Sequence, residues 1–183
     1  MATAVVLPSF DHAFYKSLDQ PTNALIKLRP SWMDVMPRLN SVFVQHNMQD
    51  RLLVAVLHRH HDLHNGEVLV ERLTTTESIT APAWSADLDP STTIPHLFRI
   101  TSDGKAAALE YLDLTSTGLS SEAAATAACT VAEVMHSDTG VVFLSDVSAL
   151  LKEAGLLGVL GIALAHREFL RGQYRFLSED FFF

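Results

Sequence analysis

Cysteine and basic residues are scarce in this chain. Of its 183 residues, Cys129 is the single cysteine, and 13 lysines and arginines face 21 aspartates and glutamates. One cysteine cannot form an intrachain disulfide, which favours a reducing compartment. The formal net charge of -8 argues against nucleic acid and against anionic membrane surfaces as partners.

Long apolar runs and the common nucleotide and hydrolase motifs are also missing. The longest apolar stretch, Gly155 to Ala165, falls short of the roughly 20 residues that cross a bilayer. The N-terminus lacks the basic and apolar regions of a secretory signal. The sequence contains no Walker loop, no G-x-G-x-x-G and no G-x-S-x-G nucleophile elbow. We therefore expect a soluble, cytoplasmic protein.

Hydrophobic residues make up 48% of the chain, which is enough to build a core in a domain of this length. We expect an N-terminal arm over residues 1–30 and a single α+β domain over residues 31–183. In the arm, Asp11 is expected to cap one short helix. In the domain, capping residues, an alanine-rich segment and an apolar stripe predict three helices, near 31–46, 121–135 and 145–154. Pro37 leaves open whether the first is one helix or two.

Turn signals divide the remaining chain into strands. Asn65-Gly66 predicts a hairpin with strands near 51–61 and 67–73, and Asp103-Gly104 predicts a second hairpin. A third is expected where the chain turns at Arg171-Gly172. Residues 74–92 are expected to form a long loop, and residues 138–144 a turn with a short extended piece. The predicted fold is a mainly antiparallel sheet or partly closed barrel of about three hairpins, with the helices packed outside.

Four histidines lie close together at the end of the first apolar run. Alternation along a strand places His58 and His60 on one face, with Arg59 and His61 on the other. Two imidazoles side by side lie within reach of one metal ion. The spacing His58-x-His60-x3-His64 resembles the first metal motif of cupins, with His64 where those proteins usually carry Glu. The second cupin motif is missing around His166, so the resemblance covers one hairpin.

The first apolar strand is echoed near the C-terminus. When the two segments are aligned so that His58-Arg59 falls on His166-Arg167, Asn47 falls on Gly155. Both of these residue types readily adopt the left-handed conformation that ends a helix. We therefore expect echoed units at about 40–73 and 148–179, related by a pseudo-twofold as an internal duplication.

The leading functional hypothesis is a metal-dependent enzyme that acts on a small polar molecule. The predicted ligands of the divalent ion are His58, His60, His166 and Glu168, a set that suits Zn, Fe, Mn, Ni or Cu. Arg59 and Arg167 are candidate clamps for an anionic group, and His64 is a further candidate catalytic residue. Hydrolysis, lyase chemistry and oxygenation all stay open.

The alternative is a non-catalytic binding or scaffold protein that forms a homodimer through Phe181–Phe183. In that case the histidines are ordinary surface groups. His96 follows a proline at a strand start. We expect it to have a structural role, and the alternative is that it completes a site.

Overall fold

The computed structural model describes residues 9–28 and 32–165. It combines helices with one six-stranded mixed sheet, which confirms the α+β class. In chain order the elements are α1 (His12–Ser17), α2 (Pro21–Leu28), α3 (Trp32–Gln45), β1 (Leu52–Val56), β2 (Glu67–Leu73), β3 (Ser78–Trp84), the 3-10 turn η1 (Ser85–Asp87), β4 (Thr93–Ile100), β5 (Ala106–Asp113), α4 (Ser121–His136), α5 (Asp138–Glu153) and β6 (Leu160–Leu164).

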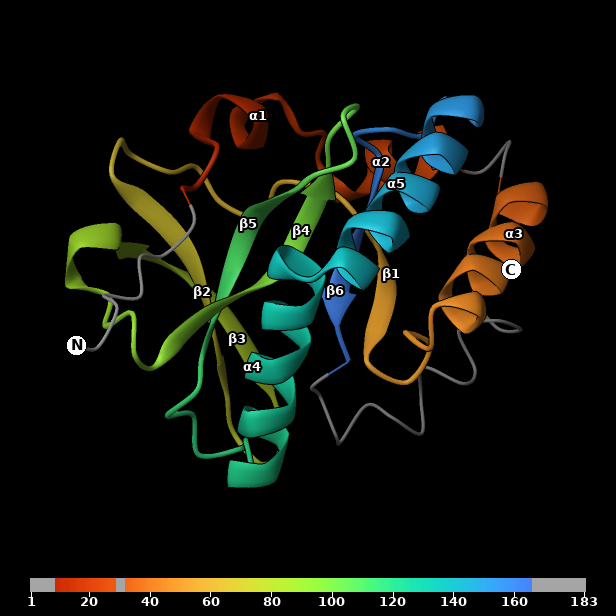
Figure 1. Cartoon of the computed structure of the whole chain (residues 1–183). Coiled ribbons are helices and arrows are strands. Elements are labelled where there is room, and N and C mark those ends of the chain that lie inside the picture. The colour runs from red at the N-terminus through yellow and green to blue at the C-terminus, as the bar shows by residue number, and fades with distance from the viewer. Residues whose placement is uncertain (1–8, 29–31, 166–183) are drawn as a thin grey trace.

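The strand order in the sheet is β1-β6-β4-β5-β2-β3 (Figure 1). All neighbouring pairs are antiparallel except β2 and β5, which run parallel. Within the described residues β1 and β3 form the two edges and do not pair with each other, so the sheet is not closed into a barrel.

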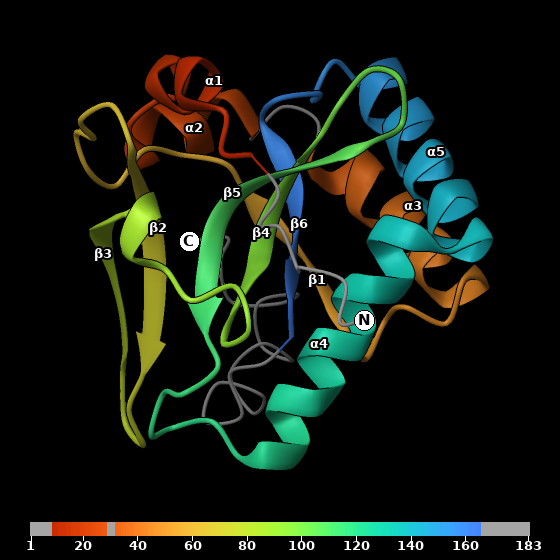
Figure 2. The same cartoon turned by 60° about the vertical axis from the view of Figure 1, so that its left-hand side comes forward.

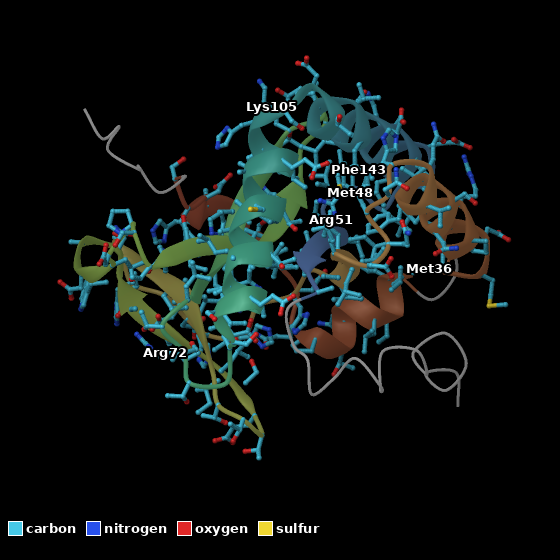
Figure 3. The ribbon with its side chains drawn as sticks, turned by 60° about the horizontal axis from the view of Figure 1, so that its bottom comes forward. Met36, Met48, Arg51, Arg72, Lys105 and Phe143 are labelled. Atoms are coloured by element: carbon cyan, nitrogen blue, oxygen red, sulfur yellow. The ribbon has the colours of Figure 1, made fainter. Side chains whose placement is uncertain are left out.

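Helices α3, α4 and α5 gather on one side of the sheet, whereas α1 and α2 lie at one end of it (Figure 2). The largest apolar cluster fills the space between these three helices and strands β1, β4 and β6. Met48 and Phe143 are fully buried in this cluster, and Arg51 lies near them (Figure 3). No helix in the described part of the chain is long and apolar enough to span a membrane.

The predicted helix signals are confirmed in several places. Asp11 caps α1, because its Oδ1 accepts a hydrogen bond from the backbone N–H of Phe14 at 2.9 Å. Helix α3 continues as one helix through Pro37. Helix α4 begins after Ser120, whose hydroxyl oxygen accepts from the backbone N–H of Ala123 at 3.1 Å. The predicted turn at Asp103-Gly104 is confirmed as well, since it joins β4 to β5 as an antiparallel pair.

The predicted hairpin around Asn65-Gly66 is wrong. Strand β1 ends at Val56 and pairs with β6, while β2 pairs with β3 and β5 at the other side of the sheet. Gly66 has a positive φ of 91°, but Asn65 does not, so the turn is not the two-residue hairpin turn that Asn-Gly favours. The turn redirects the chain into β2 without joining two paired strands, because β1 finds its partner in the last strand of the described chain.

Two other predictions of irregular structure are wrong. The segment predicted as a long loop over 74–92 contains β3. This strand lies at an edge of the sheet, where Pro82 is tolerated although its nitrogen has no hydrogen to donate to a neighbouring strand. Residues 138–144 belong to α5, with Ser137 as its cap. Gly140 is required there by close packing and not by a turn, since a Cβ would lie 2.3 Å from the carbonyl oxygen of Glu133.

The two echoed strands are neighbours. The antiparallel register of β1 and β6 places Val54 opposite Ile162, which is also the residue that it matches in the aligned sequences. Asn47 and Gly155, which follow the preceding helices, have positive φ values of 56° and 68°. An origin by duplication stays a prediction.

Candidate functional site

The histidine-rich segment, residues 57–66, connects β1 to β2 and so passes the three strands that lie between them in the sheet. Leu57 and Leu63 anchor it in an apolar cluster that also contains Tyr15 of α1. The Tyr15 hydroxyl accepts hydrogen bonds from the backbone N–H groups of His60 and His61, at 3.1 and 3.2 Å. The backbone that carries the histidines is therefore held by α1.

Tyr15 holds this backbone as a neutral phenol. Burial raises the pKa of its hydroxyl, while the hydrogen bonds from the backbone of His61 and His60 lower the pKa by less. The neutral hydroxyl lies 3.3 Å from the carbonyl oxygen of His61, to which it can donate its proton.

His58 and His60 lie close together as predicted, although the strand whose alternation was the basis of that prediction ends at Val56. Their ring centroids are 4.3 Å apart. Nδ1 of His58 lies 2.8 Å from the carbonyl oxygen of Val56. Because a carbonyl only accepts, Nδ1 is the donor in this hydrogen bond, and Nε2 is the ring nitrogen left to contact a ligand. The side chain of His60 is 41% exposed.

Three buried ionisable residues lie on adjacent strands behind His60. Nε2 of His96 in β4 is 3.4 Å from a carboxylate oxygen of Glu110 in β5 and 3.4 Å from one of Glu71 in β2. All three side chains are at most 5% exposed. The ladder between β4 and β5 is irregular on both sides of Leu97, and such bulges redirect side chains, often beside functional sites.

The buried trio of Glu71, His96 and Glu110 is connected to partly exposed residues at both ends. Nε2 of His60 is 3.7 Å from Oε1 of Glu110. The hydroxyl of Ser78 donates a hydrogen bond to Oε1 of Glu71. Ionisable and hydroxyl side chains thus lie next to one another from His60 to Ser78, at ion-pair distances of 3.4–3.7 Å from His60 to Glu71 and with a hydrogen bond between Glu71 and Ser78.

The other predicted site residues in the described part of the chain lie in different surroundings. Arg59 is 3.5 Å from the exposed carboxylate of Asp62, and its backbone N–H donates to the carbonyl oxygen of Asp19. His64 is exposed, and its backbone N–H donates to Glu67 at 2.8 Å. His166, Arg167 and Glu168 lie outside the described residues, as does Phe181–Phe183.

The end of the described chain bears on the predicted four-ligand metal site. Ala165 donates its backbone N–H to the carbonyl oxygen of Arg51 at 2.9 Å, whereas His58 follows the opposite end of β1. Within residues 9–28 and 32–165, no three His, Cys, Asp or Glu side chains are grouped so that they could hold a metal ion. The described residues therefore supply His58 and His60 without a complete metal site.

Sequence reasoning missed Glu71 and Glu110 and gave His96 a structural role. A signal was present, because both glutamates stand between apolar residues inside predominantly apolar strands, EVLVERL and AAALEYLD. Glutamate is almost never fully buried without a partner, so its presence in a buried strand is informative. What the sequence does not contain is the pairing of β4, β5 and β2 that brings the three residues together.

Comparison with known proteins gives no relative from which to transfer a role. The sequence matches no protein-family model, no curated protein and no solved structure.

Proposed function

We propose that the protein is an enzyme that transfers protons to or from a small polar molecule at His60, with Glu110 behind the imidazole and His58 beside it. The observation that carries the proposal is the contact between the partly exposed His60 ring and the buried Glu110 carboxylate. A carboxylate next to an imidazole orients the ring and stabilises its protonated form. His60 can then take a proton from a bound substrate and return it.

His58 is assigned a binding role. Its Nδ1 is engaged with the carbonyl oxygen of Val56, so Nε2 is the atom that can accept a hydrogen bond from a substrate hydroxyl or amine. The ring lies close enough to His60 for one small molecule to touch both imidazoles. Acid–base chemistry of this kind is common to hydrolases and lyases. We propose in addition that the enzyme is cytoplasmic.

The buried trio supports a functional interpretation over a purely structural one. Burying His96 with two glutamates costs free energy that apolar residues of similar size would not cost. Local departures from an apolar interior are expected where function demands them.

The test is the depletion of small molecules from a cell extract freed of protein, followed by mass spectrometry. Wild-type protein is expected to consume at least one polar metabolite, and His60→Gln is expected to lose this activity by about a hundredfold or more. His61→Gln is the matched control, because the exposed His61 is adjacent in sequence and its Nε2 lies 3.1 Å from the carbonyl oxygen of Thr80. The proposal would be contradicted if His60→Gln and His61→Gln both still consumed the metabolite, or if the wild-type protein consumed none.

A divalent metal ion bound at His58 and His60 is the second candidate, and the His58 hydrogen bond favours it. Histidines that ligate metals almost always donate their other ring N–H to a carbonyl or carboxylate, as Nδ1 of His58 does to Val56. Glu110 is a described carboxylate close to His60, and further ligands would have to come from outside the described part of the chain.

Metal analysis of protein purified without a histidine tag separates the two candidates. One equivalent of Zn, Fe, Mn, Ni or Cu in the wild type, lost in a folded His58→Ala/His60→Ala variant, would establish the metal. If metal-free protein still consumes its substrate, the metal is not needed and proton transfer by His60 is the remaining candidate.

A further inference from the structure

A separate pocket lies between α1, α2 and the turn that leads into β6. Its volume is about 260 Å³, and its apolar wall includes Phe14, Leu18, Leu57 and Val159. Phe14 and Leu18 come from α1 and its C-terminal cap, and Leu57 directly follows β1. The pocket is open to solvent, and polar as well as apolar groups line it.

The polar part of this pocket is an ion pair. Nζ of Lys27 lies 2.5 Å from Oδ2 of Asp19, and the two side chains are 58% and 31% exposed. Both residues line the pocket. An exposed pair of this kind contributes little to stability, so a ligand can separate the two groups at small cost.

We propose that this pocket binds a small zwitterion with an apolar side chain, the chemistry of a free aliphatic amino acid. The ligand's carboxylate would pair with Lys27 and its ammonium group with Asp19, while its side chain contacts the partly exposed Phe14 and Val159. A ligand with both charges replaces the ion pair that it separates with two new ones, whereas a ligand with a single charge makes only one. The site therefore favours both charges on one molecule.

The pocket is distinct from the site of the proposed proton transfer but is joined to the same segment of chain. Leu57 forms part of its wall, and the carbonyl oxygen of Asp19 accepts a hydrogen bond from the backbone N–H of Arg59 at 2.8 Å. Binding itself needs no catalysis, so it can be tested whether or not His60 acts as proposed.

The experiment measures binding of three probes by calorimetry and by two-dimensional NMR. The probes are L-leucine, 4-methylpentanoate, which lacks the ammonium group, and 3-methylbutylamine, which lacks the carboxylate. Wild-type protein is expected to bind leucine about threefold to fivefold more tightly than either analogue, as the loss of one exposed ion pair requires. Amide signals of Phe14 and Gly158, both in the pocket wall, are expected to shift on addition of leucine.

Two variants assign the charges. Lys27→Met should bring leucine down to the affinity of the amine, and Asp19→Asn should bring it down to that of the carboxylate analogue. Lys16→Met is the matched control, since exposed Lys16 on α1 lies 3.4 Å from Asn65 and does not line the pocket. Equal binding of all three probes, no binding at millimolar concentration, or leucine affinity that survives both variants would each overturn the proposal.

Discussion

Nε2 of His96 lies 3.4 Å from Oε2 of Glu110, and both side chains are almost completely buried. The same nitrogen is equally close to Oε2 of Glu71. One imidazole thus stands between two carboxylates that come from different strands. Its removal would leave two acidic groups together in the interior, where like charges repel and neither is well solvated.

Replacement of His96 by leucine is therefore expected to destabilise the fold strongly. Breaking a buried pair by removing one partner typically costs about 3–5 kcal/mol. Urea denaturation at neutral pH measures the loss. His61→Leu is the matched control, and since His61 is exposed its effect should stay within about 0.5 kcal/mol.

The cause of the loss can be separated from simple misfit. The triple variant Glu71→Gln/His96→Leu/Glu110→Gln carries no charge at the trio and is expected to recover much of the stability. A single His96→Leu variant that loses less than about 1 kcal/mol would show that the trio is not electrostatically coupled.

We expect the protein to lose stability in alkali because of the buried hydroxyl of Tyr111. Burial raises the pKa of its hydroxyl to about 12 from its ordinary value of 10.0. Since the folded-state pKa is the higher one, stability is complete below pH 10 and falls as the pH rises towards 12. The loss attributable to this residue reaches about 3 kcal/mol.

Denaturation curves between pH 8 and 11 measure the Tyr111 effect, and Tyr111→Phe is the comparison variant. The stability of this variant should decline less steeply above pH 10 than that of the wild type. Identical slopes for the two proteins would show that the Tyr111 hydroxyl ionises as readily in the folded chain as in the unfolded one.

From the positive φ values of Asn47 and Gly155 we predict how substitutions at these two residues change the stability of the fold. Gly155 has a φ of 68°, and a Cβ built there meets nothing within 4 Å, so a substitution reports on the backbone alone. Gly155→Ala is expected to cost about 1–2 kcal/mol. Gly155→Asn should cost less, because asparagine tolerates the left-handed region.

The reciprocal change tests the other turn. Asn47→Gly should leave stability nearly unchanged or raise it, and Asn47→Val should lower it by about 1–2 kcal/mol. Thermal unfolding of the four variants gives the comparison. Equal effects of alanine and asparagine at residue 155 would contradict the left-handed backbone conformation of Gly155.

Features determined by a few neighbouring residues could be predicted from the sequence. The cap at Asp11, the α3 and α4 helices, the Asp103-Gly104 hairpin and the proximity of His58 and His60 all follow from local patterns. Each depends on interactions within about four residues or on a short turn.

Features determined by long-range pairing could not be predicted in the same way. The wrong hairpin joined β1 to the next strand in sequence, although its partner is β6. The buried trio depends on a parallel contact between β2 and β5, and no local pattern specifies such a contact. The echo between the segments around β1 and β6 was the one long-range signal, and it relates two strands that are in contact.

The helices that precede the two strands are also in contact. Arg38 of α3 pairs with Glu153 of α5, and His46 pairs with Asp146, so the two helices run antiparallel as the two strands do. A pseudo-twofold relation between the two units stays a prediction.

Arg51 and Glu133 predict a loss of stability in acid. Hydrogen bonding from the Arg51 guanidinium lowers the pKa of the Glu133 carboxyl below its ordinary value of 4.5. Because the folded-state pKa is the lower one, the stabilisation is present above pH 4.5 and is lost as the pH falls below that value. Both side chains are about one third exposed, so the contribution is small, about 0.5–1 kcal/mol.

A double-mutant cycle isolates this contribution from the rest of the acid response. Glu133→Gln, Arg51→Gln and the double variant are compared with the wild type by urea denaturation at pH 7 and at a pH below 4. The coupling energy is expected at pH 7 and should shrink at the lower pH, where the carboxyl becomes protonated. A coupling energy that stays constant across this range would mean that the pair is held by hydrogen bonding geometry and not by the charge of Glu133.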